Sequence, residues 1–268
     1  MDGIIIVNKP AGWTSFDVVA KIRNLTGVKK VGHSGTLDPM ATGVLPIFLG
    51  KATKSISTFI EGDKGYSGEM VLGAKTDTGD ADGKVLSPKS EILNKSKIQI
   101  SKSKLEELFN KYKGEIEQVP PMYSAVKYKG ERLYKLARKG IEVKREARKV
   151  TIYDLRITGY DSSTERVSFY VLCSKGTYIR QLAMDIGDDL GCGAYLSRLE
   201  RTYSHPFHIS QALNMETIIT LAKVGKLSTV VIAPEEILTP SLTSFVPPLS
   251  IFDGEGNESR AAGERGEA

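Results

Sequence analysis

A single carboxylate, Asp38, stands in the glycine-rich stretch GHSGTLDPMATGVLPIFLGKATK, from Gly32 to Lys54. The next acid along the chain is Glu61, so Asp38 is isolated among glycine, threonine and apolar residues. The proline after it favours an extended backbone at Asp38, and the glycines allow tight turns or close approach of a ligand. Such a loop can present one carboxylate to a cleft as a nucleophile. On local chemistry alone, however, an Asx-turn is the simpler interpretation.

Basic residues are concentrated in one part of the chain. The 268 residues carry a net charge of +5, and Lys127–Lys149 alone contains ten Lys or Arg against three Glu. A dense basic segment suits a polyanionic partner, of which nucleic acid is the commonest. A solvated basic helix and hairpin explains the same charge equally well, so charge alone does not decide.

Composition argues against several classes of protein. No apolar run approaches the roughly 18 residues of a membrane-spanning helix, and MDGIIIVNKP has an acid where a signal peptide has basic residues. Cys173 and Cys192 lie far apart in apolar segments, which favours free core thiols. The spacing of His205 and His208 is no metal-site pattern. We therefore expect a cytoplasmic protein with no metal and no membrane contact.

The apolar pattern predicts an α+β fold with a mixed, mostly antiparallel sheet flanked by helices. Turn residues and alternation predict strands at 3–7, 44–49, 64–72, 148–160, 165–173 and 205–209. Capping residues and helical spacing predict helices at 15–26, 104–113, from about 131, 178–190 and 215–224. The segment 90–103 is expected to be a surface excursion, and the stretch 193–202 is assigned no element.

The acidic loop TDTGDADG, at Thr76–Gly83, invites comparison with a calcium-binding loop. Its acids fall at relative positions 1, 4 and 6 instead of 1, 3 and 5, and no Glu closes a 12-residue loop. We interpret it as a loop that shapes a cleft or the path of a bound nucleic acid.

Four further blocks accompany the Asp38 stretch. They are IIVNKPAGWTSFDVV (Ile5–Val19), DKGYSGEMVLGAKTDTGDADG (Asp63–Gly83), PPMYSAVKYKGERLYKLARKG (Pro120–Gly140) and VLCSKGTYIRQLAMDIGDDLGCGAYLSRLERT (Val171–Thr202). Together, and in this order, they resemble the TruB family of tRNA pseudouridine synthases, which form pseudouridine at position 55 in the TΨC arm. The resemblance spans roughly residues 3 to 210, so it is far more specific than one short motif. It implies a pseudouridine synthase-like catalytic domain at 1–210.

The resemblance also implies roles for individual residues. Asp38, in GTLDP, matches the catalytic aspartate, and Arg180, in GTYIR, matches the arginine that pairs with it. Tyr66, in DKGY, matches the tyrosine that stacks on the target base. The remaining matches are a histidine beside the flipped nucleotide, a substrate-contacting tyrosine and a leucine of the uracil pocket, at His33, Tyr178 and Leu199.

The chemistry of pseudouridine formation explains these residue types. The N1–C1′ glycosidic bond breaks, the uracil turns, and C5 rejoins the ribose; nothing is oxidised, so no cofactor is implied. A carboxylate is needed near C1′ or C6, and a paired arginine keeps it ionised when buried. A tyrosine offers a stacking face worth roughly 1–3 kcal/mol per base and a hydroxyl for proton transfer. The base must also be flipped out, at a cost of about a few kcal/mol.

The resemblance gives the basic segment a role as well. Region 120–149 resembles an RNA-clasping insertion, with basic and aromatic side chains suited to phosphates and bases, at Lys127, Lys129, Arg132, Lys135 and Arg138 and at Tyr123, Tyr128 and Tyr134. The implied partner is the TΨC arm of tRNA, bound by a monomer. The segment 211–240 holds a degenerate RNA-binding module or none, and 241–268 is expected to be disordered.

Other functions remain open at this point. A tRNA-folding chaperone would bind the same RNA, with catalysis incidental. A pseudouridine synthase for another RNA, guided by a partner ribonucleoprotein, would keep the same site. Glycoside hydrolysis shares the bond that breaks, but it usually requires two carboxylates flanking that bond, and the Asp38 motif supplies one.

Overall fold

The computed structural model describes residues 1–87, 100–233 and 237. Within these residues the chain is built on a nine-stranded sheet with strand order β1-β3-β12-β4-β11-β10-β7, to which β2 adds beside β3 and β13 beside β12. Every strand pairing in this sheet is antiparallel except that of β3 with β12. The predicted α+β class with a mixed, mostly antiparallel sheet is confirmed.

The strands of this sheet are β1 (Gly3–Lys9), β2 (Val31–His33), β3 (Thr42–Leu49), β4 (Lys64–Leu72), β7 (Gly114–Gln118), β10 (Arg148–Asp161), β11 (Arg166–Cys173), β12 (Ala194–Ser204) and β13 (Phe207–His208). Two small hairpins pair β5 (Lys75–Thr76) with β6 (Val85–Ser87) and β8 (Lys127–Tyr128) with β9 (Glu131–Arg132). The helices are α1 (Ser15–Thr26), α2 (Ile56–Ile60), α4 (Lys102–Lys111), α5 (Leu133–Arg138), α6 (Ile179–Asp189) and α7 (Met215–Lys223). Short 3₁₀ helices are η1 (Gly50–Ser55), η2 (Ile209–Gln211) and η3 (Leu227–Val230).

The first helix shows why local sequence was informative. Thr14 caps α1 in a reciprocal capping box with Asp17, and Gly27 ends it in the left-handed conformation. Val18 and Ile22, one turn apart, are fully buried, which anchors the helix against the sheet. The predicted boundaries of this helix and of β4 and β11 are confirmed to within a residue or two.

The main error of the prediction concerns β12, a central strand of the sheet, where residues 193–202 were assigned no element. Its sequence, AYLSRLERTYS, mixes charged and apolar residues without strict alternation. Register shifts against β4 between Leu196 and Arg198 and between Arg201 and Tyr203 explain this. A β-bulge changes which side chains face the core, so a period of two is lost from the sequence.

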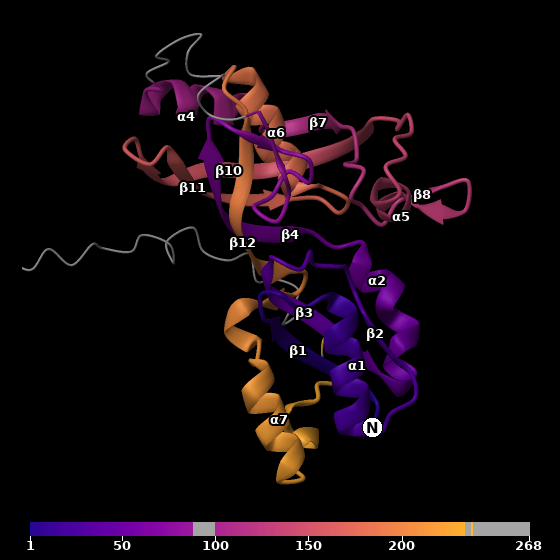
Figure 1. Ribbon diagram of the computed structural model, residues 1–268. Helices are drawn as coiled ribbons and strands as arrows, with labels where there is room; N and C mark the ends of the chain where they lie inside the picture. Colours follow the sequence, from indigo (N-terminus) through magenta and orange to yellow (C-terminus); the bar gives the residue numbers. More distant parts are fainter. Residues whose placement is uncertain (88–99, 234–236, 238–268) are drawn as a thin grey trace, which may run out of the picture.

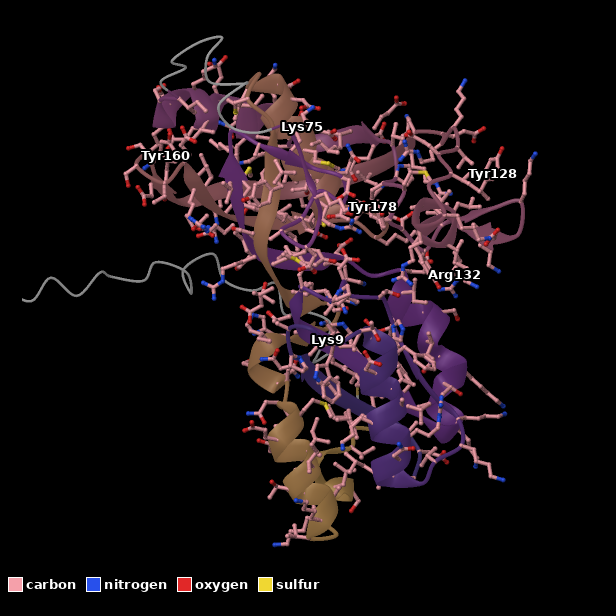
Figure 2. The ribbon with its side chains drawn as sticks, in the orientation of Figure 1. Lys9, Lys75, Tyr128, Arg132, Tyr160 and Tyr178 are labelled. Carbon is pink, nitrogen blue, oxygen red and sulfur yellow. The ribbon has the colours of Figure 1, made fainter. Side chains whose placement is uncertain are left out.

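Two further elements differ from the prediction. The strand expected at 205–209 is only the two-residue β13, followed by η2. The basic helix expected from about Glu131 begins at Leu133, because the hairpin β8–β9 turns through Lys129 and Gly130, both with positive φ. The β8–β9 hairpin and α5 project to one side of the molecule, and Tyr128 and Arg132 lie on this projection (Figure 2).

The molecule has two halves that share the sheet (Figure 1). In one, α4 packs on β10 and α6 packs on β12; in the other, α1 lies beside β2 and α7 beside β1. Alternate residues of β1 enter different clusters of the core: Ile5 and Val7 join the larger one, and Ile4 and Ile6 pack with Phe48 in the smaller one. β1 is therefore buried on both faces, as its continuous apolar run requires.

Both cysteines are free and buried, as predicted. Burial raises the pKa of the Cys173 thiol to about 12, so it is a packing residue without thiolate character. No helix in the described ranges is long and apolar enough to cross a membrane. The tail predicted to be disordered, 241–268, and most of the expected excursion at 90–103 lie outside the described residues.

The close approach of β3 to β12 at Gly43 can be tested by substitution. Gly43 has φ +102°, and a Cβ there would lie 2.2 Å from the carbonyl oxygen of Arg201 on β12. Gly114 has a similar φ of +96° with nothing within 4 Å. Backbone strain of roughly 1–3 kcal/mol applies to Ala at either position, but only Gly43→Ala also pushes β3 away from β12. Urea unfolding should show a larger loss of stability for Gly43→Ala than for Gly114→Ala; equal losses would contradict this close approach.

Candidate active site

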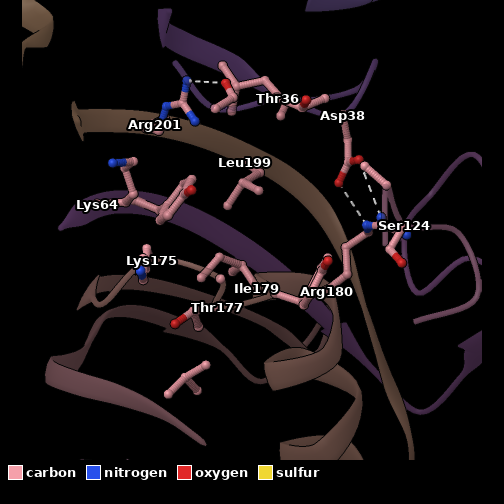
Figure 3. Close-up of a pocket in the computed structure, with 18 of the residues that line it drawn as sticks. Thr36, Asp38, Lys64, Ser124, Lys175, Thr177, Ile179, Arg180, Leu199 and Arg201 are labelled. Carbon is pink, nitrogen blue, oxygen red and sulfur yellow. Dashed lines mark hydrogen bonds and ion pairs between the residues drawn. The ribbon is translucent and has the colours of Figure 1, made fainter. Parts of the chain in front are cut away.

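A cavity of about 560 Å³ opens where the two halves meet. Its walls come from the loop after β2, from β4 and β12, from the residues leading into α6, and from region 120–149. Five of the six predicted site residues line it: Asp38, Tyr66, Tyr178, Arg180 and Leu199. Volumes of this size are typical of small-molecule sites, so the tertiary structure gathers residues from four distant sequence blocks into one candidate site (Figure 3).

Asp38 and Arg180 form a two-point ion pair in this cavity. Arg180 Nε donates to Asp38 Oδ2 at 2.8 Å, and Nη2 donates to Oδ1 at 3.3 Å. The arginine side chain is only 5% exposed, while that of Asp38 is 37% exposed. A bidentate guanidinium fixes the orientation of a carboxylate as well as its charge. Asp38 is therefore held in a fixed orientation by Arg180, with part of its carboxylate open to the cavity.

Arg180 also ties together two other loops. Its Nη1 donates to the carbonyl of Thr78 at 2.6 Å, and Nη2 donates to that of Tyr123 at 2.7 Å. A second carboxylate, Asp80, lies 3.6 Å from Arg180 Nε. Asp80 is buried, accepts from the Thr78 hydroxyl and from the Asp82 amide, and is not among the residues lining the cavity. It supports Arg180 without flanking the cavity as a second reactive acid would.

The loop that carries Asp38 is held by residues of the N-terminal block. The Ser15 hydroxyl accepts from the Leu37 amide at 2.9 Å. The carbonyl of Pro39 accepts from the Gly12 amide at 2.9 Å and from Lys9 Nζ at 3.1 Å. In the described residues the Asp38 carboxylate accepts from Arg180 and from no amide of its own loop. The Asx-turn interpretation is therefore wrong, and the loop is a rigid mount for one carboxylate.

Lys9 contributes electrostatics as well as hydrogen bonds. It is fully buried, and burial lowers the pKa of its ammonium to about 8, an effect that the nearby Asp38 charge opposes. The sequence does carry a signal for this role: Lys9 ends the apolar strand GIIIVNK. A lysine is rarely buried without a specific partner, so a lysine in such a strand indicates a candidate site residue.

The first turn of α6 is positioned through Gln118. The buried Gln118 side chain accepts from the Tyr178 amide at 3.0 Å and donates to the Tyr178 carbonyl at 3.3 Å. Tyr178 precedes α6 directly, so this pairing locks the backbone two residues before Arg180. Burial raises the pKa of the Tyr178 phenol. Both tyrosine and arginine thus enter the cavity from one fixed turn.

The opposite wall is formed by neighbouring strands. Tyr66 of β4 faces Arg201 of β12 as a cross-strand partner, and Leu199 of β12 faces Gly68. Tyr66 is buried, and burial raises the pKa of its phenol, so its hydroxyl keeps its proton at neutral pH. Lys64 and Arg201 line the same wall. Neither is among the predicted site residues, although both lie in the blocks that resemble the family, Asp63–Gly83 and Val171–Thr202.

His33 is the exception among the predicted residues. It ends β2, two residues before Gly35, which lines the cavity, but His33 itself is not among the lining residues. Burial lowers the pKa of its imidazole, and the charge of Arg201 lowers it further. The structure therefore brings His33 near the wall and not into the cavity.

Most of the chain matches known proteins. Residues 23–179 match the family described as TruB family pseudouridylate synthase (N terminal domain), and residues 180–241 match the tRNA pseudouridylate synthase B C-terminal domain. A tRNA pseudouridine synthase B of Geobacillus thermodenitrificans is 46% identical over 89% of this chain and 78% of its own length. One from Clostridium tetani is 51% identical over 81% and 73%.

A solved structure, that of a Cbf5-Nop10-Gar1 complex, aligns with a TM-score of 0.66 at 29% identity. The alignment covers 86% of this chain and 60% of the other, so the chain spans about three fifths of that protein. The fold and the cavity together with these matches define a pseudouridine synthase, an isomerase. Because the family match covers more than half of its length, the chain belongs to the TruB family.

The Asp38–Arg180 geometry predicts that Arg180→Lys is far from conservative. A lysine has one point charge and no planar fork, so it cannot bond both Asp38 oxygens and the carbonyls of Thr78 and Tyr123 together. Misplacement of a reactive group by about 1 Å costs on the order of 10²-fold in rate, and we expect a loss of that size in pseudouridine formation. Arg166→Lys, in the exposed pair with Glu69, is the control. Equal rates for the two variants would contradict the role of the fork.

Proposed function

We propose that this enzyme isomerises uridine to pseudouridine at position 55 in the TΨC arm of tRNA, with Asp38 as the nucleophile. The observation that carries the proposal is the single partly exposed carboxylate, fixed by Arg180 in a cavity that Tyr66 and Leu199 also line. The names of relatives 46–51% identical to the chain support tRNA as the substrate.

The proposed reaction uses these residues in turn. The target uridine is flipped out of the RNA into the cavity, where Tyr66 and Leu199 hold the uracil between a ring and an aliphatic side chain. Asp38 attacks at C1′ or at C6, and the two-point contact with Arg180 keeps its carboxylate aimed until then. After the N1–C1′ bond breaks, the uracil turns and joins the ribose through C5. Tyr178 contacts the substrate from the α6 side, and His33, which lies next to the cavity wall and not in its lining, is proposed to lie beside the flipped nucleotide outside the uracil pocket.

The chain is proposed to bind tRNA as a monomer, with residues 1–210 as the catalytic domain and 211–240 as a short C-terminal segment. The projecting hairpin and α5 within region 120–149 would clasp the RNA. Its cations are exposed there, and Arg138 and Lys129 stack on Tyr134 and Tyr128, with 5.5 and 5.6 Å to the ring centres. Such pairs suit phosphate contacts combined with stacking on bases.

The alternatives make different demands on the site. A tRNA-folding chaperone would need the basic surface but not an Asp38–Arg180 pair in a cavity. A synthase guided by a partner ribonucleoprotein would be expected to match the protein of a Cbf5 complex at least as well as proteins named tRNA pseudouridine synthase B, yet the identity is 29% against 46–51%. We therefore favour a stand-alone enzyme of the cytoplasm acting on tRNA.

The nucleophile is tested with Asp38→Asn. The amide keeps the shape of the side chain but lacks the charge and nucleophilicity of the carboxylate, so conversion of uridine 55 in an unmodified tRNA transcript should fall below detection while tRNA binding persists. Asp161→Asn, in the β10–β11 turn, is the matched control. Tritium release from 5-labelled uridine tRNA reports the reaction, and mapping of the modified uridine reports the position. Release by the Asp38→Asn protein would disprove the nucleophile; no release by the wild type would favour the chaperone.

The RNA-clasping role is tested through salt dependence. Lys129→Gln with Arg132→Gln removes two exposed cations from the hairpin, and each lost phosphate contact should reduce the slope of log K against log salt by about 0.7–0.9. Lys104→Gln with Lys111→Gln on α4 makes the same change in charge away from the cavity. An unchanged slope for the hairpin variant would mean that this hairpin does not contact the RNA.

A further inference from the structure

Arg201 is a buried cation that the proposed mechanism does not use. It is 1% exposed and lines the cavity. Its Nε donates to the carbonyl of Val44 at 2.8 Å, and Nη2 donates to that of Gly35 at 3.1 Å. Among the ion pairs of the described residues, none joins Arg201 to a carboxylate. An unpaired buried guanidinium is expensive to maintain, and groups kept at such a cost are concentrated at functional sites.

On the neighbouring strand, Tyr66 lies directly opposite Arg201. The two residues are cross-strand partners on β12 and β4, and both line the cavity; the charge of Arg201 partly opposes the rise that burial causes in the pKa of the Tyr66 phenol. A guanidinium only donates hydrogen bonds, so in a hydrogen bond between these neighbours the phenol oxygen is the acceptor. The proton of the Tyr66 hydroxyl is then free to point away from Arg201, toward a base in the cavity.

The cavity therefore has two electrostatically different ends. Near α6 the charge of Asp38 is matched by Arg180. On the strand wall Arg201 lies beside Lys64, whose pKa is lowered to about 8 by burial and by the charge of Arg201. In Figure 3 the side chains of Arg201 and Lys64 lie on one side of Leu199, and those of Asp38 and Arg180 lie on the other. Arg148, Lys149 and Lys175 also line the cavity but are exposed, so the buried cations on the wall that carries Tyr66 are Arg201 and Lys64.

The reaction generates a charge that this wall can stabilise. When the N1–C1′ bond breaks, its electron pair stays with the uracil, and C1′ is bonded to the Asp38 carboxylate or left electron-deficient. The uracil is negative until C5 donates an electron pair to C1′. Loss of the proton from C5 and gain of one at N1 complete the isomerisation. Hydrogen-bond donors that are already oriented toward a developing charge often make the largest single contribution to the rate enhancement of an enzyme.

We propose that Arg201 is a positioning residue that, through the Tyr66 hydroxyl, stabilises the negative charge on the detached uracil. The inference rests on the proposed function, in which the uridine enters this cavity. It predicts that Arg201 matters for the steps between bond cleavage and rejoining, and not for binding of the RNA, because its side chain is buried and does not reach the surface.

The test compares Arg201→Met with Arg201→Lys in single-turnover assays at saturating protein. Loss of a donor at a developing charge costs on the order of 10²-fold in rate, which we expect for Arg201→Met with RNA affinity unchanged within about twofold. Arg201→Lys keeps the positive charge, so its single-turnover rate should be at least tenfold higher than that of Arg201→Met. Arg198→Met, an exposed arginine on the same strand, is the control with an unchanged rate. An equal loss for the Met and Lys variants would contradict a role of the charge.

A second measurement separates this role from a structural one. RNA carrying 5-fluorouridine has a more acidic base, which needs less stabilisation as an anion. Arg201→Met should therefore slow consumption of 5-fluorouridine at least fivefold less than that of uridine, whereas a distorted cavity would slow both equally. Tyr66→Phe with Arg201→Met should lose no more than the worse single variant, because one acts through the other; multiplicative losses would overturn the inference. Failure of the wild type to convert tRNA would instead contradict the proposed function.

Discussion

The ion pair between Asp38 and Arg180 is the interaction on which the rest of the site depends. It joins residues 142 positions apart in the sequence. Arg180 also bonds the loop of Thr78 and the insertion residue Tyr123, so one guanidinium aligns three chain segments around a carboxylate. Any movement of these loops shifts the arginine, and with it the orientation of Asp38. The Arg180 side chain is only 5% exposed, so water has little access to compete for its contacts with the carboxylate.

The sheet makes this convergence possible. Pairing of β3 with β12 is the one parallel contact of the main sheet in the part of the chain that the structure describes, and it joins the half that carries Asp38 to the half that carries Tyr66 and Arg180. The absence of a side chain at Gly43 allows these two strands to approach. The cavity lies at this junction, where loops from both halves meet over strands that are fixed on both sides.

The acids and bases of the site are distributed unequally. Asp80 is close to Arg180, but it is buried and satisfied by Thr78 and Asp82, so the cavity presents one reactive carboxylate. A glycoside hydrolase needs a second one to protonate the leaving group or activate water. Lys9, Lys64 and Arg201 supply positive charge instead, a balance that suits a base carrying negative charge before it is rejoined.

The sequence by itself determined the local elements and the identity of the main groups. Capping at Thr14 and Gly27, alternation in β10 and β11, and the ordered blocks led to α1, to the strand pair and to Asp38, Tyr66 and Arg180, because these signals arise from residues close in the chain. Only the tertiary structure decided that β12 is a central strand, since its bulges hide the alternation. It alone showed that Arg201 lines the cavity, that Asp80 supports Arg180 and Lys9 the Asp38 loop from outside the lining, and that His33 also lies outside it. Burial and long-range pairing decide the roles of charged residues, and neither is encoded in local spacing.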